Sequence, residues 1–404
     1  MIWKTDFSKW RQNVITANNY LKNEADMKAK VLLIFIAIIF IFGIFSGCEP
    51  TEIKGERQAR IIGGIQWDNA MDFSEGMAAV QKDGKWGFIN MDGLLVIECL
   101  YDSVWSFKEG YAAVQIGRKW GYIDKLGIIV IDPEYDSTWY FSEGMAAVVK
   151  KEKYGYINES GKLSVECQYD DAKNFSNGVA VVKKGGKYGL IDKKDNIISD
   201  FIWVEIGPMR EEVCEVFDEY LSGFLNNKGE LVLDKTYEDA DFFSEGLAKY
   251  KVEFLWGFIN KNGETVIEPK WTDVSEMVKN RAIYTIQGKK GYIDNTGKEI
   301  TKAIYTYAYN FSEDLARIGT EETLTLSFGF ISLDGTLVIQ PIWEEARDFK
   351  DNIAAVKSGG KWGYIDKNGK LIIDMQFSEA FSLSEGYARV CIGDKYGFIY
   401  IEKQ

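Results

Sequence analysis

Aromatic and aliphatic residues recur along most of the chain in short runs separated by turns that contain glycine. Residues 77–81 and 85–90 form one pair of such runs around an Asp-Gly turn, and residues 94–97 follow a second turn at 90–93. Asp or Asn followed by Gly is typical of tight turns between antiparallel strands, because Gly readily adopts positive φ. The alternation has no helical period. This pattern predicts about three short antiparallel strands per stretch and an all-β body.

The stretch repeats at a fixed spacing. A glycine with aromatic neighbours in most copies recurs every 34 residues, apart from one step of 38 residues between Gly291 and Gly329. These glycines are Gly87, Gly121, Gly155, Gly189, Gly223, Gly257, Gly291, Gly329, Gly363 and Gly397. Ten copies in register indicate a tandem array in which each unit covers its neighbours.

The second strand of the unit is apolar on both faces, with Trp86 and Phe88 on one and Ile89 on the other. An isolated three-stranded sheet is only marginally stable in water, so adjacent copies must cover both faces. Residues that recur in every copy are therefore interpreted as core. This interpretation includes the aromatic column from Trp67 to Phe377, which is expected to pack inside the array and not to form a sugar-binding surface.

Two architectures accommodate such an array. A propeller blade normally has four strands, and three strands per copy favour an open solenoid or superhelix. The alternative is a closed, propeller-like ring. A strand-like piece at residues 60–67 precedes the first copy, and the last copy ends after its second strand at Ile401. That first piece supplies the strand missing from the last copy if the ring closes.

The motif Lys-Trp-Gly-aromatic-Ile occurs at residues 85–89, 119–123 and 361–365, with Phe-Ser-Glu-Gly upstream at 73–76. In these residues the chain resembles the WG-repeat (KWG-repeat) proteins over residues 61–401. That family is bacterial and often exported. The resemblance implies binding through the repeats more than catalysis.

Residues 31–45 are an unbroken run of 15 apolar or small residues, preceded by Lys28 and Lys30. A membrane-spanning helix needs about 20 such residues, whereas the hydrophobic core of a secretory signal has about 7–15. The run therefore fits a signal peptide better than a spanning helix.

Residues 44–48, Ile-Phe-Ser-Gly-Cys, resemble the lipobox of bacterial lipoproteins, which makes Cys48 the lipid anchor. The expected organisation is an upstream extension at 1–26 that need not be translated, a lipoprotein signal peptide at 27–47, a tether at 48–60 and the repeat array at 61–404. The alternative is a signal anchor that is not cleaved. The protein is thus expected to be exported and lipid-anchored to the cell membrane or outer membrane, with its body in the periplasm or outside the cell.

Charge and composition narrow the function. The net charge is −13, and residues 1–47 are basic, so the acidic excess lies in the repeats. An acidic body argues against nucleic acid as a partner. The chain has no histidine, which removes Ser-His-Asp and Cys-His catalysis. We expect a binding protein that is not an enzyme and needs no cofactor; the alternative is a carboxylate-based glycan hydrolase or lyase.

A column of acidic residues recurs in the turn before the first strand of most copies: Glu75, Glu109, Glu143, Glu211, Glu245, Glu313, Asp351 and Glu385. It is interpreted as a solvated turn, with cation or basic-partner binding as the alternative. The Asn/Asp-Gly turns lack the downstream Glu of a calcium loop, so no metal site is expected. Cys99, Cys167, Cys214 and Cys391 have no disulfide-like spacing and are interpreted as small apolar fillers.

The two places where the repeat breaks are better candidates for a binding surface than the repeat itself. One is the four-residue insertion in the eighth copy, with its tip at Thr320, Glu321, Glu322 and Thr323; the other contains Glu211 and Glu212. The predicted partner is a protein or a cell-envelope glycan, besides the membrane that holds the lipid. A passive envelope spacer is the remaining alternative.

Overall fold

The computed structural model describes residues 53–55, 59–322 and 325–402. The upstream extension, the signal peptide and Cys48 lie outside the described residues, as does Thr323. Within the described part, no helix has the length and hydrophobicity needed to cross a bilayer.

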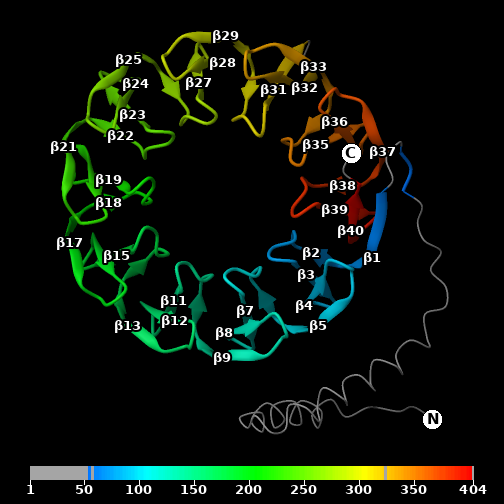
Figure 1. Cartoon of the computed structure of the whole chain (residues 1–404), viewed down its shortest axis with the longest axis horizontal. Helices are drawn as coiled ribbons and strands as arrows, with labels where there is room; N and C mark the ends of the chain where they lie inside the picture. Colours follow the sequence, from blue (N-terminus) through cyan, green and yellow to red (C-terminus); the bar gives the residue numbers. More distant parts are fainter. Residues whose placement is uncertain (1–52, 56–58, 323–324, 403–404) are drawn as a thin grey trace. The chain divides into compact units, whose positions relative to one another are not determined.

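Residues 59–402 form a closed ring of ten four-stranded antiparallel blades around a central opening (Figure 1). Blade 1 contains β2 (Asn69–Ala70), β3 (Met77–Lys82), β4 (Lys85–Asn90) and β5 (Leu95–Tyr101), in that order from the opening outward. Blades 2 to 9 repeat this order. The innermost strand of every blade has two residues, and this strand with the turn after it lines the opening, which we call the inner wall (Figure 1).

The remaining strands take the same four places. The innermost strands are β6 (Ser103–Val104), β10 (Ser137–Thr138), β14 (Asp171–Ala172), β18 (Glu205–Ile206), β22 (Asp239–Ala240), β26 (Asp273–Val274), β30 (Tyr307–Ala308), β34 (Glu345–Ala346) and β38 (Glu379–Ala380). The second strands are β7 (Tyr111–Ile116), β11 (Met145–Lys150), β15 (Val179–Lys184), β19 (Val213–Phe217), β23 (Leu247–Val252), β27 (Arg281–Ile286), β31 (Leu315–Glu322), β35 (Ile353–Ser358) and β39 (Tyr387–Ile392). The third strands are β8 (Lys119–Asp124), β12 (Lys153–Asn158), β16 (Lys187–Asp192), β20 (Ser222–Asn226), β24 (Leu255–Asn260), β28 (Lys289–Asp294), β32 (Thr325–Ser332), β36 (Lys361–Asp366) and β40 (Lys395–Ile401). The outermost strands are β9 (Ile129–Tyr135), β13 (Leu163–Tyr169), β17 (Ile197–Trp203), β21 (Leu231–Tyr237), β25 (Thr265–Trp271), β29 (Glu299–Tyr305), β33 (Leu337–Trp343), β37 (Leu371–Phe377) and, in blade 10, β1 (Ala59–Trp67).

Blade 10 combines the two ends of the described chain. β1 pairs antiparallel with β40, with Ile61 opposite Ile399 and Ile62 opposite Phe398, and it is the outermost strand of the sheet β1-β40-β39-β38. The expectation of an open solenoid or superhelix is therefore wrong, and the alternative of a closed ring is right. The error comes from the strand count, because each copy has four strands and the innermost is too short to show a period of two residues.

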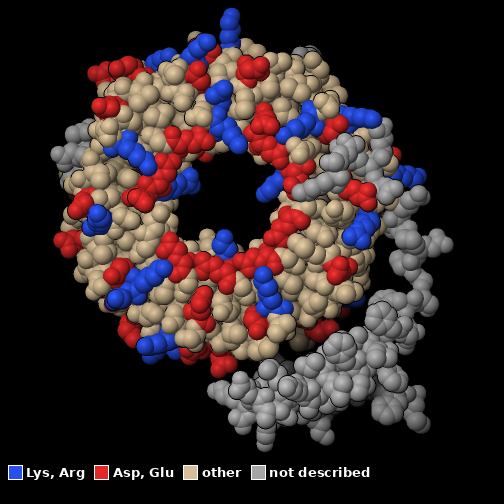
Figure 2. Space-filling view, in the orientation of Figure 1, with Lys and Arg blue, Asp and Glu red and all other residues tan. Residues whose placement is uncertain are grey.

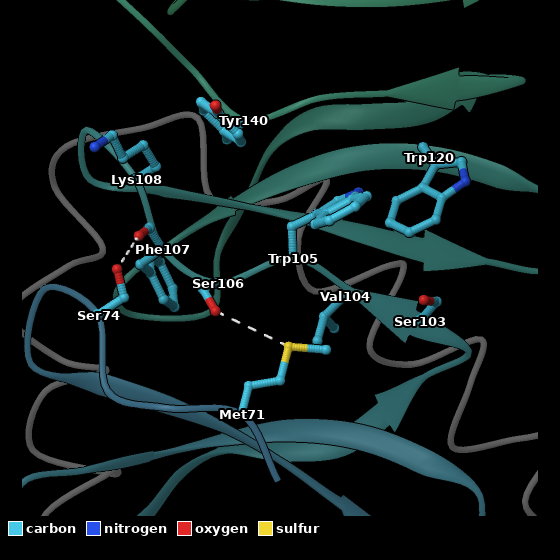
Figure 3. Close-up of a pocket in the computed structure, with 10 residues that line it drawn as sticks. All are labelled: Met71, Ser74, Ser103, Val104, Trp105, Ser106, Phe107, Lys108, Trp120 and Tyr140. Carbon is cyan, nitrogen blue, oxygen red and sulfur yellow. Dashed lines mark hydrogen bonds between the residues drawn. The ribbon is translucent and has the colours of Figure 1, made fainter. Parts of the chain in front are cut away.

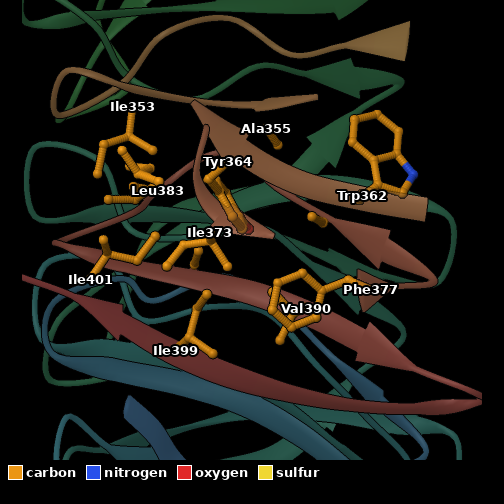
Figure 4. Close-up of a cluster of buried hydrophobic side chains, with 13 residues drawn as sticks. Ile353, Ala355, Trp362, Tyr364, Ile373, Phe377, Leu383, Val390, Ile399 and Ile401 are labelled. Carbon is orange, nitrogen blue, oxygen red and sulfur yellow. The ribbon is translucent and has the colours of Figure 1, made fainter. Parts of the chain in front are cut away.

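The core lies between the blades. Between blades 9 and 10, Tyr364 and Phe377 pack with Val390 and Ile399 at 0% exposure (Figure 4). Aromatic pairs also link neighbouring blades; the rings of Phe88 and Phe107, for example, lie edge to face at 4.9 Å. The interpretation of the recurrent aromatic residues as core is confirmed for most members of the column that starts at Trp67, which is 3% exposed.

Candidate functional site

A series of carboxylates links the blades around the inner wall. Gly110 N donates to Glu75 Oε2 in the preceding blade (2.9 Å), and Glu75 N donates in turn to Glu385 Oε1 (2.7 Å), which connects blade 10 to blade 1. The same contact joins Glu109 to the amides of the next turn, at residues 143–144. Figure 2 shows Asp and Glu side chains gathered around the central opening. The acidic column is thus a connection between blades as well as a solvated turn.

Lysines from the hairpins of later blades reinforce four of these carboxylates. Lys125 Nζ lies 3.3 Å from Glu75 Oε2, and Lys261 Nζ lies 3.0 Å from Glu211 Oε2; the other two pairs are Lys193 with Glu143 and Lys367 with Glu313. Partial burial raises the pKa of Glu75, but hydrogen bonds from Gly110 and Lys125 outweigh it and hold the pKa below its usual range. These carboxylates therefore connect neighbouring blades of the ring.

The structure separates the two predicted binding segments. Glu211 belongs to the carboxylate series, because it accepts a hydrogen bond from Gly246 N (3.2 Å) and pairs with Lys261, while its neighbour Glu212 is exposed with φ of 68°. The insertion lengthens the hairpin of blade 8: Thr320 pairs with Ser327 and Glu321 with Leu326. Because this tip lies at the far end of β31 from the acidic turn, the segments do not form one site.

A second kind of contact between blades uses cationic side chains. At five of the ten boundaries, a Lys or Arg donates to the carbonyl of the last residue of the next innermost strand. The donors and acceptors are Lys173 to Ile206 (3.1 Å), Lys249 to Val274 (3.5 Å), Arg317 to Ala346, Arg347 to Ala380 (2.7 Å) and Arg389 to Ala70 (2.7 Å). At four boundaries, with or without such a cationic contact, a buried tyrosine hydroxyl donates to the backbone carbonyl of the residue that follows the next innermost strand. The donors are Tyr122, Tyr156, Tyr292 and Tyr364.

The boundaries from blade 1 to 2 and from blade 5 to 6 carry neither contact among the described residues, and a cavity lies at each. The first, the aromatic cavity, has a volume of about 620 Å³ and extends to blade 3 (Figure 3). Its lining residues are Met71, Ser74, Ser103, Val104, Trp105, Ser106, Phe107, Lys108, Trp120 and Tyr140. Trp105 and Tyr140 are 46% and 42% exposed, so indole and phenol surfaces are accessible on the inner wall.

The second, the acidic cavity, has a volume of about 480 Å³. Its lining residues are Glu205, Gly207, Glu215, Phe217, Ser222, Glu238, Asp239, Ala240 and Asp241. Burial, and secondarily the charge of Asp241, raises the pKa of Glu215 to about 8. In the described part of the chain, no group of three or more His, Cys, Asp or Glu side chains is arranged to hold a metal ion.

The sequence interpretation missed both cavities, although it pointed to the fifth copy. The available signal was Ser222, which replaces the aromatic residue that precedes the glycine in most copies.

The family model for the WG-containing repeat matches ten segments: 61–86, 86–120, 120–154, 154–188, 188–217, 223–253, 256–289, 291–321, 328–362 and 362–396. The chain is a WG-repeat protein. The two longest interruptions between the WG-repeat matches are residues 218–222, beside the acidic cavity, and 322–327, in the lengthened hairpin; shorter gaps lie at 254–255 and 290. Both departures from the repeat are therefore departures from the family pattern as well.

No curated protein sequence matches this WG-repeat chain. Among solved structures, a crystal structure of the eukaryotic initiation factor aligns with a TM-score of 0.45 at 12% identity, over 72% of this chain and 89% of that one. BamB from Moraxella catarrhalis aligns with a TM-score of 0.35 at 8% identity, over 86% of this chain and 98% of that one. The WD40 domain of Neurospora crassa Pan2 aligns with a TM-score of 0.28 at 10% identity, over 55% and 86%. Likenesses this distant carry no argument about function.

Proposed function

We propose that this protein is a lipid-anchored, extracytoplasmic binding module without catalytic activity, and that its inner wall binds a protein partner. The aromatic cavity carries the proposal. Trp and Tyr are enriched at the energetically dominant positions of protein interfaces, where they bury large areas at a low cost in side-chain entropy. Trp105 and Tyr140 leave nearly half of their surfaces exposed beside Trp120.

A capture experiment with envelope fractions tests whether the cavity binds a ligand and whether that ligand is a protein. We expect the full chain to retain an envelope component, and the double substitution Trp105→Ala and Tyr140→Ala to reduce retention at least about tenfold, as for the loss of an interface centre. Phe254→Ala is the matched control, because Phe254 is 82% exposed and lies outside the cavity. Protease treatment of the envelope fraction should abolish retention. Loss after periodate oxidation instead identifies a glycan, and equal retention by all variants refutes the role of the cavity.

The anchor rests on the resemblance of residues 44–48 to a lipobox and needs its own test. We expect metabolic labelling with a palmitate analogue to depend on Cys48 and to disappear in Cys48→Ala. Cys99→Ala controls for acylation at another cysteine. Unchanged labelling of the Cys48 variant contradicts lipidation at this residue.

A carboxylate-based glycan hydrolase or lyase is the second candidate, favoured by one observation. Glu215 has a pKa raised to about 8 and lies in a cavity with Glu205 and Asp241, and a carboxyl group that keeps its proton near neutral pH beside other carboxyl groups is the arrangement of a general acid. Hydrolysis or elimination on a panel of envelope glycans that is lost in Glu215→Gln supports this candidate. Absence of turnover across the panel counts against it.

A further inference from the structure

Two blades hold an arginine side chain between a pair of aromatic rings. In blade 8, the guanidinium of Arg317 lies 3.7 Å from the ring centre of Tyr309 and 5.8 Å from that of Phe328. Nε of Arg317 also lies 3.1 Å from Asp348 of the next blade. Because the face of an aromatic ring attracts a cation, two rings and a carboxylate together hold this arginine.

Blade 10 repeats the arrangement. The guanidinium of Arg389 lies 3.7 Å from the ring centre of Phe381 and 5.9 Å from that of Tyr396. Its Nε lies 2.8 Å from Asp72 of blade 1. Two separate boundaries thus use the same place for a cation.

Blade 2 keeps both rings and lacks the arginine. Trp105 N donates to Ala113 O at 2.9 Å. The amides of Tyr309 and Phe381 make the same bond to the carbonyls of their arginines, both at 3.1 Å. Trp105 therefore takes the place of the first ring and Ala113 that of the arginine. Trp120, which precedes the repeated glycine of blade 2, takes the place of the second ring.

The loss of the arginine leaves the first ring of blade 2 accessible. Trp105 is 46% exposed, whereas Tyr309 and Phe381, which lie beneath arginines, are partly buried. Trp105 and Trp120 lie at one end of the aromatic cavity (Figure 3). Its volume of about 620 Å³ lies in the range of small-ligand sites, about 300–1,000 Å³, so the cavity has room for a charged group.

The neighbouring groups differ from those at the arginine sites in the hydrogen bonds that they offer. Tyr140 stands where Asp348 and Asp72 stand, and among the described residues no carboxylate lines the cavity. The carbonyl of Trp139 already accepts a hydrogen bond from Tyr122 (2.6 Å). A guanidinium or a primary ammonium group therefore finds fewer acceptors here than Arg317 and Arg389 find, and desolvating its N–H groups is costly.

A trimethylammonium group suits this cavity better, because it has no N–H donor and binds to aromatic faces alone. Trp105 and Trp120 from blade 2 and Tyr140 from blade 3 all line the cavity. The carboxylates around the central opening (Figure 2) raise the local concentration of cations. Aromatic faces inside an acidic opening therefore favour a quaternary ammonium ligand.

Trimethylammonium groups occur on methylated lysine side chains and on choline phosphate esters. Lys108 is the one cationic side chain in the cavity lining, and it lies at the opposite end from Trp120 (Figure 3). The acidic turns with Glu75 and Glu109 disfavour a phosphate. A methylated lysine brings the cation without an anion, so we favour the protein side chain.

We propose that Trp105, Trp120 and Tyr140 form an aromatic cage for a trimethylated lysine side chain of the partner protein, in the place that Arg317 and Arg389 fill in their own blades. This inference rests on the proposed function in one respect, that the partner is a protein.

The test uses the full chain and N-acetyl-trimethyllysine methylamide. Its two analogues are the unmethylated lysine and a neutral isostere in which carbon replaces the charged nitrogen. We expect saturation-transfer NMR to detect the trimethylated probe with a dissociation constant of about 1 mM, and each analogue at least about tenfold more weakly. Equal binding of either analogue overturns the proposal. Glycerophosphocholine is the fourth probe, and tighter binding of it than of trimethyllysine overturns the protein side chain as the ligand.

Two variants test the position of the cage. Trp105→Ala should weaken binding of the trimethylated probe about tenfold, and Phe254→Ala, outside the cavity, should leave it unchanged. Ala113→Arg supplies a guanidinium from within blade 2 and should abolish binding. The proposal is also overturned if Trp105→Ala binds the probe as tightly as Phe254→Ala. Because Trp105 is 46% exposed, this comparison holds even if Ala113→Arg folds poorly.

The cage and the proposed function fail in different experiments. Preferential binding of the trimethylated probe by a chain that captures no envelope protein contradicts the proposed function and supports the cage. Capture of a protein that depends on Trp105 and Tyr140, without any preference for the trimethylated probe over its neutral isostere, supports the proposed function and overturns the cage.

Discussion

The Phe-Ser-Glu-Gly motif of the first copy joins blade 1 to its neighbours through three separate contacts. In the first copy, Phe73 packs against Phe398 of blade 10 at a ring distance of 4.9 Å. The hydroxyl of Ser74 donates to the carbonyl of Phe107 in blade 2 (2.7 Å), and Glu75 accepts from Gly110. Glu75 has φ of 53°, which is uncommon for a residue with a Cβ. The repeated contacts hold this conformation around the ring.

Glu109 tests the contribution of one such carboxylate to stability. Its two oxygens accept from Glu143 N (2.7 Å) and Gly144 N (2.8 Å), and Glu109→Ala leaves both amides to water. Because the site is exposed, we expect the free energy of unfolding to fall by only about 1 kcal/mol. Urea denaturation measures the change, with Glu166→Ala as the exposed control. A loss no larger than that of the control contradicts a structural role for the series.

Glu215 makes the stability of the folded protein depend on pH. Its pKa is raised from 4.5 to about 8, by burial first and then by Asp241; a hydrogen bond from Ser222 lowers it, and Asp239 and Glu205 raise it by smaller amounts. The folded protein therefore holds more protons than the unfolded chain between about pH 4.5 and 8, and stability falls as the pH rises through this range.

Glu215→Gln removes that loss, so we expect its melting temperature to exceed that of the native protein at pH 8.5 and to approach it at pH 5. Thermal unfolding at both pH values measures the difference. An identical pH dependence for the two proteins rules out the raised pKa.

At the scale of the strand, the sequence predicted the strands in which apolar and polar residues alternate over several positions. Residues 85–90 were expected as a strand and form β4, because alternation and the flanking turns mark both ends. β2 was missed, because two residues show no alternation and its pairing with β3 depends on the next turn folding back. The same limit applies to the cavities. Their position depends on which residues face the next blade, and the spacing of the repeat does not show that.

The hairpin of blade 8 differs in length from the equivalent hairpins of the other blades. β31 and β32 have eight residues each, against six in most second and third strands. Removing residues 322–325 leaves Thr320 paired with Ser327 and a two-residue turn, as in the other blades. We expect the unfolding free energy to change by less than about 1 kcal/mol, because Glu321 and Thr325 on either side of the hairpin tip are exposed.

If this hairpin is part of the binding surface, the shortened variant should capture less of the envelope partner at unchanged stability. Parallel capture and thermal-unfolding measurements separate the two effects. Capture equal to that of the native protein removes the hairpin from the binding surface.

At the scale of the whole ring, stability depends on one pairing between distant parts of the sequence. β1 and β40 join residues more than 300 positions apart, and Arg60 lies opposite Tyr400 with its guanidinium 5.3 Å from the ring. An open array would leave these residues at opposite ends of a rod. Ring closure also explains how blade 10 obtains its outermost strand, so that all ten blades have four strands.

Arg60→Cys combined with Tyr400→Cys tests closure directly. Paired positions on adjacent antiparallel strands lie within the range that a disulfide spans, so we expect mild oxidation to link them and to alter mobility on a non-reducing gel. The bond closes a loop of more than 300 residues, which should stabilise the ring by about 3–5 kcal/mol and raise its melting temperature. Each single substitution controls for the native cysteines, and Arg60→Cys with Lys184→Cys, in blade 4, controls for collision between distant sites. Equal linking in that distant pair and in the closure pair contradicts a closed ring.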